Sequence, residues 1–271
     1  MAITRRAVLK GFAGATAAVI AGGGAYGYFD ERLQLVVEHA DVPVAGLPAA
    51  LSGVRIGFIS DVHCSRWLSP EDVHAVASRL NDEKPDVIFL GGDYVTWGDR
   101  KFVHASAEAL SPLDAPHGVF GILGNHDDDR DMPAALTAKR IAVLKDARTH
   151  LTINGELVNL VGIRFWTKRP ADLAPLLRFA SGTTILLAHD PRRLAEATAL
   201  NVPLVLSGHT HGGQVVLPLV GAIAAQKFPV VSGIGRREKT TMFVSRGVGT
   251  VYVPVRINCP PEVAVLTLKS V

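Results

Sequence analysis

Short apolar segments that alternate with helical patterns constrain the fold of this chain most strongly. Five segments have the apolar character and the length of buried strands, namely 54–59, 87–90, 118–123, 184–187 and 202–206. Helical spacing fills most of the intervals around them, at 70–80, 102–110, 132–140, 173–179 and 192–200. This alternation is typical of α/β proteins, in which helices cover a largely parallel sheet.

The pattern changes in two places, which indicates a second sheet. A hairpin is predicted where the segments 150–153 and 157–163 flank the turn Asn154-Gly155. After Gly208 the helical periodicity stops, and further strands are predicted at 242–245, 251–255 and 263–268. We therefore expect an α/β fold with two packed mixed sheets and helices outside, in one domain over residues 40–271. A chain of this length can bury a sufficient core without disulfides.

The first 29 residues have the composition of a targeting segment. Arg5, Arg6 and Lys10 are basic, and residues 11–29 contain no charge. A basic start followed by an apolar run is typical of export signals, and the adjacent arginines resemble a bacterial twin-arginine signal. The uncharged run is also long enough to span a bilayer, so a cleaved signal, a retained membrane anchor and a buried helix remain open.

Polar clusters follow five of the predicted strands, each at the carboxyl end. They occupy residues 61–63, 91–93, 124–127, 188–190 and 208–211. Ligands of open α/β sheets bind beyond the carboxyl ends of the strands, so these clusters can converge on one site. The spacing of Asp61 with His63, and of His209 with His211, lets both side chains of a pair leave an extended segment in the same direction.

The side chains in these clusters are typical ligands of transition metals. Carboxylates, imidazoles and an amide oxygen suit Mn, Fe or Zn better than ions that prefer thiolates. Seven candidates are too many for one tetrahedral zinc and fit two metal ions with a bridging carboxylate: Asp61, His63, Asp93, Asn125, His189, His209 and His211. A pair of such ions activates water and stabilises both oxygens of a phosphoryl displacement.

The order of these motifs resembles that of the calcineurin-like metallophosphoesterase superfamily. Asp-x-His, Gly-Asp, Gly-Asn-His-Asp, a single His and Gly-His-Thr-His follow one another between residues 53 and 214. The later segments 245–250 and 254–262 resemble the bacterial exported or membrane-anchored branch of small phosphodiesterases. The resemblance implies a four-layer α/β/β/α sandwich with a dinuclear metal site at the strand ends.

The resemblance also implies a role for each motif residue. The ligands of one ion are expected to be Asp61, His63 and His211, those of the other Asn125, His189 and His209, with Asp93 as the bridge. His126 is expected to be catalytic, because it would face the phosphate and stabilise or protonate the leaving group without binding metal. Asp127 is expected to orient His126, and a cap on the backbone is the alternative.

Departures from the family pattern narrow the substrate class. Thr96 stands where purple acid phosphatases have a metal-binding Tyr, three residues after Asp93, which argues against an iron–tyrosinate site. The motifs typical of protein Ser/Thr phosphatases are not present in the sequence, so a phosphoprotein substrate is not favoured. Outside the motifs, Arg256, Trp67 and Trp97 are candidates for facing the substrate, with ordinary packing as the alternative.

The leading hypothesis is therefore an exported, metal-dependent phosphodiesterase. It would act in the periplasm or on the outer face of the cytoplasmic membrane, and phosphomonoesters and lipid-linked pyrophosphates remain open as substrates. A non-catalytic metal-binding module is the alternative, but degenerate members lose ligands and all seven are present. Without the three basic residues of the leader, 25 basic residues face 25 acidic ones, so charge gives no argument for nucleic-acid binding.

Overall fold

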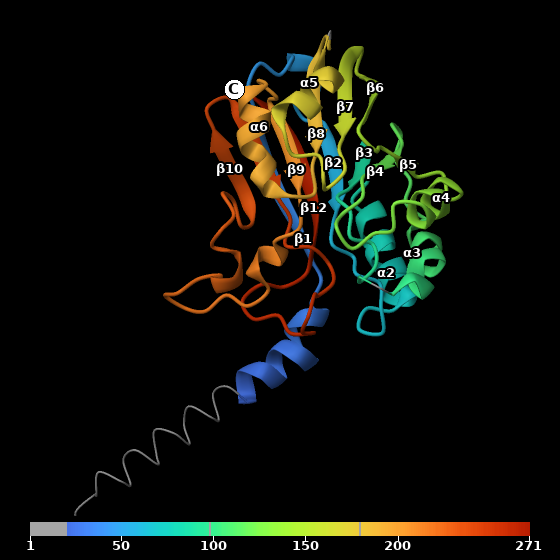
Figure 1. The fold of residues 1–271 in the computed structure, drawn as a ribbon, viewed down its shortest axis with the longest axis vertical. Coiled ribbons are helices and arrows are strands. Elements are labelled where there is room, and N and C mark those ends of the chain that lie inside the picture. The colour runs from blue at the N-terminus through green and yellow to red at the C-terminus, as the bar shows by residue number, and fades with distance from the viewer. Residues whose placement is uncertain (1–20, 98, 179) are drawn as a thin grey trace, which may run out of the picture.

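The computed structural model describes residues 21–97, 99–178 and 180–271. Most of the predicted targeting segment, residues 1–20, therefore lies outside the described residues. The described part begins with a helix over residues 21–29, which projects from one end of the molecule (Figure 1). None of the helices in the described ranges combines the length and the apolar character that a membrane span requires.

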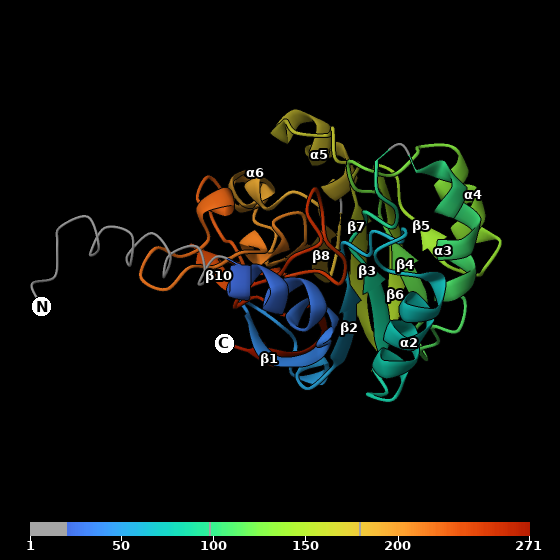
Figure 2. The same cartoon turned by 90° about the horizontal axis from the view of Figure 1, so that it is seen from below.

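Two six-stranded mixed sheets form the centre of the molecule (Figures 1 and 2). The first sheet has the order β1 (Val36–Val44), β12 (Glu262–Ser270), β2 (Arg55–Ile59), β3 (Val87–Leu90), β4 (Val119–Gly121) and β5 (Ala142–Val143). The second has the order β10 (Gly233–Arg237), β11 (Thr240–Val244), β9 (Leu204–Ser207), β8 (Thr183–Leu187), β7 (Glu156–Gly162) and β6 (Ala147–Ile153). Strands β2 to β5 run parallel, as do β7, β8, β9 and β11, while β12 is antiparallel to β2.

Helices cover the outer face of each sheet, which completes four layers (Figures 1 and 2). The first sheet carries α2 (Pro70–Asn81), α3 (Val103–Leu110) and α4 (Asp131–Thr137), and the second carries α5 (Pro170–Leu177) and α6 (Leu194–Ala199). Short 3₁₀ turns lie at Glu31–Leu33, Ala49–Leu51, Arg100–Phe102, Pro191–Arg193, His211–Gly213 and Ile223–Ala225. The four-layer α/β/β/α sandwich expected from the sequence is therefore present.

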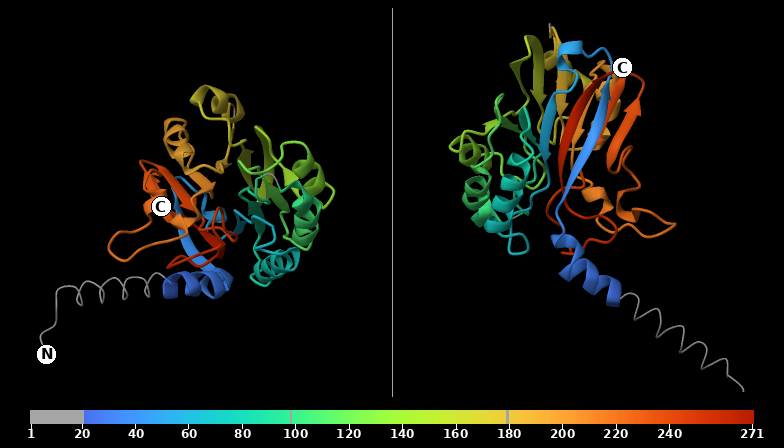
Figure 3. Two further views of the ribbon diagram at one scale, coloured as in Figure 1. Left: turned by 60° about the horizontal axis from the view of Figure 1, so that its bottom comes forward. Right: turned by 180° about the vertical axis from the view of Figure 1, so that it is seen from behind.

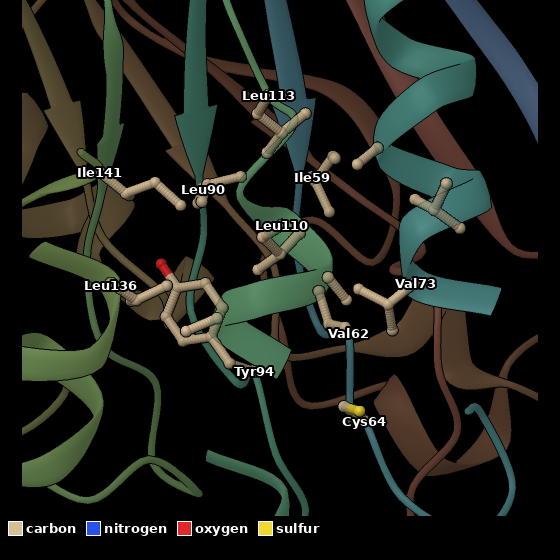
Figure 4. Packing of buried hydrophobic residues seen from close by; sticks show 14 of the residues in the cluster. Ile59, Val62, Cys64, Val73, Leu90, Tyr94, Leu110, Leu113, Leu136 and Ile141 are labelled. Atoms are coloured by element: carbon tan, nitrogen blue, oxygen red, sulfur yellow. The ribbon is translucent and has the colours of Figure 1, made fainter. Parts of the chain in front are cut away.

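Three apolar cores hold these layers together. The central core lies between the sheets, where Phe58 of β2 meets Phe243 of β11 edge to face at 6.3 Å between ring centroids. A second core joins the first sheet to its helices, and Figure 4 shows Ile59 and Leu90 facing Leu110 of α3. Because β2 and β3 are covered on both faces, their sequences are continuously apolar without alternation.

Helix α2 shows how local sequence sets an element boundary. Ser69 accepts a hydrogen bond from Asp72 N at its N-terminus, and the Asp72 side chain accepts one from Ser69 N. Pro70 occupies the first turn, where its missing N–H has no cost. This capping box fixes the start of the helix and hence the path of the loop that leaves β2.

Several elements differ from the sequence expectations. The predicted strand at 251–255 is wrong, because Tyr252 has a left-handed backbone with φ of +62° and Pro254 lacks an N–H donor. Strand β1 was not predicted, since the charged residues of this edge strand hide its apolar pattern. Strand β10, also an edge strand, ends in Arg236-Arg237 and likewise lacks an apolar run.

Candidate metal centre

The carboxyl ends of five strands meet at one edge of the sandwich. The segments after β2, β3 and β4 come from the first sheet, and those after β8 and β9 come from the second. Their ligand atoms form three overlapping groups, with all atoms of a group within 4.8 Å of one another: Asp61 with His63 and His211, His63 with Asp93 and His126, and Asp93 with His189 and His209. The five clusters of the sequence therefore converge in space.

The backbone brings these side chains together in a strained conformation. Left-handed φ values occur at Asp61 (+52°), His63 (+49°), Asp93 (+57°), His209 (+72°) and His211 (+52°). The expectation that each pair leaves an extended segment is therefore wrong, although the pairs do converge. Non-glycine residues in this region store strain of roughly 1–3 kcal/mol each, and such residues gather at functional sites.

The polar atoms of the cluster lie within contact distance of one another. His63 Nε2 is 3.1 Å from His211 Nε2, and His211 Nε2 is 3.3 Å from Asp61 Oδ1. On the other side, Asp93 Oδ2 is 3.1 Å from His189 Nε2 and 3.6 Å from His63 Nε2. Asp93 is thus close to histidines of both halves of the cluster, as a bridging carboxylate must be.

Several buried donors and acceptors of the cluster lack a partner. Among the described side chains, the buried polar atoms without a hydrogen bond include Asn125 Oδ1, His189 Nε2, His63 Nδ1 and His211 Nδ1. Buried polar atoms are nearly always satisfied, so each such atom calls for an explanation. Metal ions between these oxygen and nitrogen atoms would satisfy Asn125 and His189, and the residues present therefore fit the cofactor.

Burial and the neighbouring carboxylates determine the charge of the histidines in the cluster. It lowers the pKa of His63 to about 3 and that of His209 to about 4, and it lowers the pKa of His211 well below its ordinary value. Burial also opposes the charge of His189, but the carboxylates of Asp93 and Asp61 outweigh it and raise its pKa to about 10. Three imidazoles are therefore neutral at neutral pH, the form in which histidine binds metals.

The two aspartates respond to burial in opposite directions. Burial raises the pKa of Asp61 to about 6, and the neighbouring Asp93 carboxylate adds to this. Burial opposes ionisation of Asp93 as well, but its pKa is lowered because His189 and His63 outweigh that effect. Asp93 is therefore the more firmly ionised of the two carboxylates.

Hydrogen bonds with Ser60 and with backbone groups orient the side chains of the cluster. Gly91 O lies 2.7 Å from His189 Nδ1, which directs Nε2 of that ring towards the carboxylates. Ser60 Oγ donates a hydrogen bond of 2.6 Å to Asp61 Oδ2, and His209 N donates to both oxygens of Asp61. Ser60 lies outside the clusters predicted from the sequence, and the role of the Gly91 carbonyl within the cluster 91–93 was not predicted, because a single serine or carbonyl carries no pattern.

Arg256 is buried behind the cluster's loops, where it binds backbone carbonyls, and it does not line the cavity over the cluster. Its side chain is fully buried and donates to the carbonyls of Cys259, Arg246, Gly247 and Gly249. A Cβ on Gly247 would lie 2.6 Å from Asp61 Cβ, so this loop packs directly against a candidate ligand. The expectation of a site-facing role is corrected by this burial, since the guanidinium satisfies backbone carbonyls instead.

His126 and Asp127 have separate environments. Trp97 N donates a hydrogen bond of 2.9 Å to His126 Nδ1. Asp127 instead accepts hydrogen bonds from the backbone N–H groups of Asp93, Tyr94 and Gly124, at 2.7 to 2.9 Å. The structure therefore shows the backbone cap for Asp127, and the partner that orients the His126 ring is the backbone of residue 97.

A cavity of about 480 Å³ opens over the cluster. Its polar lining includes Asp93, Asn125, His126, His209 and His211, and its apolar lining includes Leu217, Ile223, Phe228, Tyr252 and Val253. Trp97 and Trp67 border an adjoining cavity of about 240 Å³ together with His126. A larger cavity of about 790 Å³, which contains Lys239 and Val271, has none of the candidate ligands in its walls.

The chain is similar to bacterial proteins over nearly its full length. It is 33% identical over 282 residues to YkuE, an uncharacterised metallophosphoesterase of Bacillus subtilis, covering 99% of this chain and 98% of the relative. It is 31% identical over 279 residues to the phosphodiesterase YaeI of Escherichia coli, covering 98% of this chain and 99% of that protein.

A solved structure and a family match agree with these relatives. The NAD nucleotidase of Haemophilus influenzae superposes with a TM-score of 0.51 at 14% identity, over 72% of this chain and 45% of that one, which shows a shared fold. The family described as calcineurin-like phosphoesterase matches residues 54–213. That range includes every candidate ligand and covers more than half of the chain, so the chain belongs to the calcineurin-like phosphoesterase family.

Proposed function

We propose that this protein is a phosphodiesterase that hydrolyses phosphodiester bonds with the help of two transition-metal ions. The observation that carries the proposal is the cluster itself, in which three groups of ligand atoms overlap at His63 and Asp93. A single metal site would not explain overlapping groups that extend from Asp61 to His209. The similarity to a phosphodiesterase of Escherichia coli supports the choice of diester over monoester.

The groups that the side chains form support the assignment of six ligands, and the buried, unpaired Oδ1 of Asn125 supports that of the seventh. We assign Asp61, His63 and His211 to one ion, Asn125, His189 and His209 to the other, and Asp93 to both. Bound ions of this kind supply Lewis acidity, which makes water more acidic and offsets charge on phosphate oxygens. Manganese, iron and zinc all suit this set of nitrogen and oxygen donors.

His126 is the protein group best placed to act on the substrate. It lines the cavity over the cluster, and its Nδ1 accepts the Trp97 N–H. In the neutral ring this leaves the proton on Nε2, where it can donate to a phosphate oxygen or to the leaving group. Such a group contributes typically ~10²–10⁴-fold to the rate.

The assignment is tested by metal content and activity together. Asp93→Asn should lower the content of both ions and abolish hydrolysis of bis-p-nitrophenyl phosphate, because it removes the shared carboxylate. Asp41→Asn, at an exposed aspartate paired with Lys269, is the matched control and should retain both. Full metal content and full activity in Asp93→Asn would show the assignment to be wrong.

The role of His126 is tested with leaving groups of different basicity. His126→Ala should keep both metals and lose rate mainly on phosphodiesters with poor leaving groups, since p-nitrophenolate needs little protonation. An equally large loss with p-nitrophenolate would indicate stabilisation of transition-state charge instead. Loss of a metal ion would make His126 a ligand, as its place in one of the three groups permits.

The proposal also includes the cellular location of the protein and the class of its substrate. Arg5-Arg6 and the uncharged run support export to the periplasm or attachment to the outer face of the cytoplasmic membrane. The apolar wall of the cavity supports a substrate with an apolar part, such as a lipid-linked pyrophosphate. Replacing Arg5 and Arg6 together by Lys should retain active enzyme inside the cell, and unchanged export of that variant would refute the twin-arginine route.

A further inference from the structure

Two loops beside the cavity expose large apolar side chains to solvent. Leu219 is fully exposed, Tyr252 is 94% exposed, and Val220, Ile223 and Val253 are each more than half exposed. Together with Leu217 these residues form what we call the apolar rim: Leu217, Leu219, Val220, Ile223, Tyr252 and Val253. Soluble proteins rarely leave so many apolar side chains exposed side by side unless they bind a partner.

The rim has a fixed conformation. Leu217 and Gly221 pair through two backbone hydrogen bonds of 3.1 and 2.8 Å, which closes a tight turn around Leu219. The side chain of Gln214 joins the two loops, because it donates to Val253 O and accepts from Val251 N at 2.8 Å each. The side chains of the rim therefore project outward from a braced framework.

Backbone strain at the rim also favours a binding partner. Leu219 has φ of +66° and Tyr252 has φ of +62°, although both carry bulky side chains. Each such residue costs roughly 1–3 kcal/mol. An exposed leucine and an exposed tyrosine gain little packing energy within this chain, and a contact with a partner would offset the strain.

The charge around the rim identifies the kind of partner. The sequence from 211 to 237 contains no Asp or Glu, and neither does the sequence from 246 to 261. Lys227 is exposed and lines the cavity beside the rim, and Arg66 stacks over the Trp67 ring of the adjoining cavity. These two segments carry apolar tips and cations without acids, and Glu31, which contacts the second segment, is buried against the backbone of Asn258 and Cys259. Such a surface fits a bilayer that contains anionic lipids.

The N-terminal helix leads to the same face. Arg256 N donates a hydrogen bond of 3.1 Å to Gly27 O, so the helix is attached to the loop that carries Tyr252. Figures 1 and 3 show this helix and the loop around Leu219 projecting from the same end of the molecule. The preceding sequence is uncharged back to Gly11, and an uncharged run of 19 residues is long enough to enter a bilayer. A bilayer that holds this segment lies within reach of the rim.

We propose that the apolar rim is a membrane-docking surface that inserts into the headgroup region of an anionic phospholipid bilayer. Leu217, Ile223, Tyr252 and Val253 also line the cavity over the metal cluster. Docking therefore opens that cavity towards the lipid surface. This inference does not depend on the reaction catalysed, and it holds for a protein with any phosphoester substrate.

A fluorophore at the rim tests the proposal on the full chain. Cys64 and Cys259 are buried, so Leu219→Cys can be labelled selectively with an environment-sensitive NBD dye. With vesicles of phosphatidylcholine and phosphatidylglycerol, the emission should shift to the blue and rise several-fold, and doxyl-labelled lipids should quench it. The matched control is Val271→Cys, an exposed apolar residue at the opposite end, whose emission should not change (Figure 1).

Two results would overturn the proposal. If the protein co-sediments with vesicles while the dye at 219 behaves like that at 271, the N-terminal segment alone holds the membrane. If the dye at 219 shifts with protein concentration and without vesicles, the partner is a second copy of the chain.

A second variant separates docking from misfolding. Replacing Leu219 and Val220 together by Asp should abolish the blue shift of a dye placed at Ile223→Cys. Hydrolysis of soluble bis-p-nitrophenyl phosphate is measured on the two-aspartate variant with native Ile223 and no dye, and it should stay unchanged because neither Leu219 nor Val220 lines the cavity. A blue shift that survives the two aspartates, in a variant with unchanged hydrolysis, would also refute the proposal.

Discussion

Gly92 offers a sharp test of how the fold positions the metal ligands. It precedes Asp93 and has φ of +92°, and a Cβ built there would lie 2.4 Å from Gly124 N and 2.8 Å from Leu123 C. Both are backbone atoms that cannot rotate away. Non-bonded atoms pack best at ~3.5 Å, so Gly92→Ala must separate the two loops by roughly 1 Å. These loops carry Asp93 and Asn125, which we assign to the same ion.

Gly53 provides the matched control, because its φ of +94° is nearly the same and no atom lies within 4 Å of its Cβ position. Both variants incur the penalty of a left-handed alanine, about 1–2 kcal/mol. Only Gly92→Ala adds the collision. A misplacement of ~1 Å can lower activity ~10²-fold, so kcat/KM of Gly92→Ala should fall by about that factor, with loss of metal, while Gly53→Ala keeps both.

Urea unfolding followed by circular dichroism gives the free energies, bis-p-nitrophenyl phosphate hydrolysis gives kcat/KM, and mass spectrometry gives the metal content. The reasoning fails if the two variants lose equal stability and keep equal activity. In that case the contact between residues 92 and 124 would not set the spacing of the ligands.

Three further predictions concern stability. Burial raises the pKa of Asp146, but the hydrogen bonds that its carboxylate accepts lower that pKa by more. Asp146→Asn should therefore lower the free energy of unfolding at neutral pH by roughly 1–2 kcal/mol. This loss should shrink as the pH falls below ~3.9, the ordinary pKa of an aspartate. Urea unfolding at several pH values checks this, and a loss that grows in acid would contradict it. Phe58→Ala should cost about 3–5 kcal/mol and Phe58→Leu much less, measured by the same method, because the ring fills the core between the sheets; equal losses would contradict that account. Gly27→Ala should speed hydrogen exchange in 254–257, since its Cβ would lie 2.5 Å from Arg256 O, and unchanged exchange would show that the helix is not docked there.

The sequence predicted the sandwich because buried strands and amphipathic helices carry strong patterns. Strands β2, β3, β8 and β9 are covered on both faces, so their apolar runs are unmistakable. Edge strands such as β1 have one exposed side and carry charges, so their patterns resemble loops. The segment 251–255 has the composition of a strand, but a left-handed residue and a proline make it a loop.

The site was predictable as a set of residues and not as a geometry. Histidines and carboxylates after strands are visible in sequence, and the structure brings them together in three overlapping groups, one of which also contains His126. The hydrogen bonds that hold the site residues in place could not be predicted from the sequence, because they involve backbone atoms. The Gly91 carbonyl, the Trp97 N–H and the carbonyls around Arg256 belong to residues whose side chains say nothing about these contacts.

The cluster lies where the two sheets meet, and each assigned ion would draw ligands from both. Asp61 and His63 belong to the first sheet and His211 to the second, and the same division separates Asn125 from His189 and His209. Each ion would then act as a further cross-link between halves that adhere through the central apolar core and through hydrogen bonds such as that from Thr241 Oγ1 to Pro43 O. A ligand that binds only the folded state adds RT ln(1 + [L]/Kd) to stability, so chelation would weaken the adhesion of the sheets as well as stop the chemistry. Because the same residues bind the ions and join the two sheets, the folded state would last longer when metal is available.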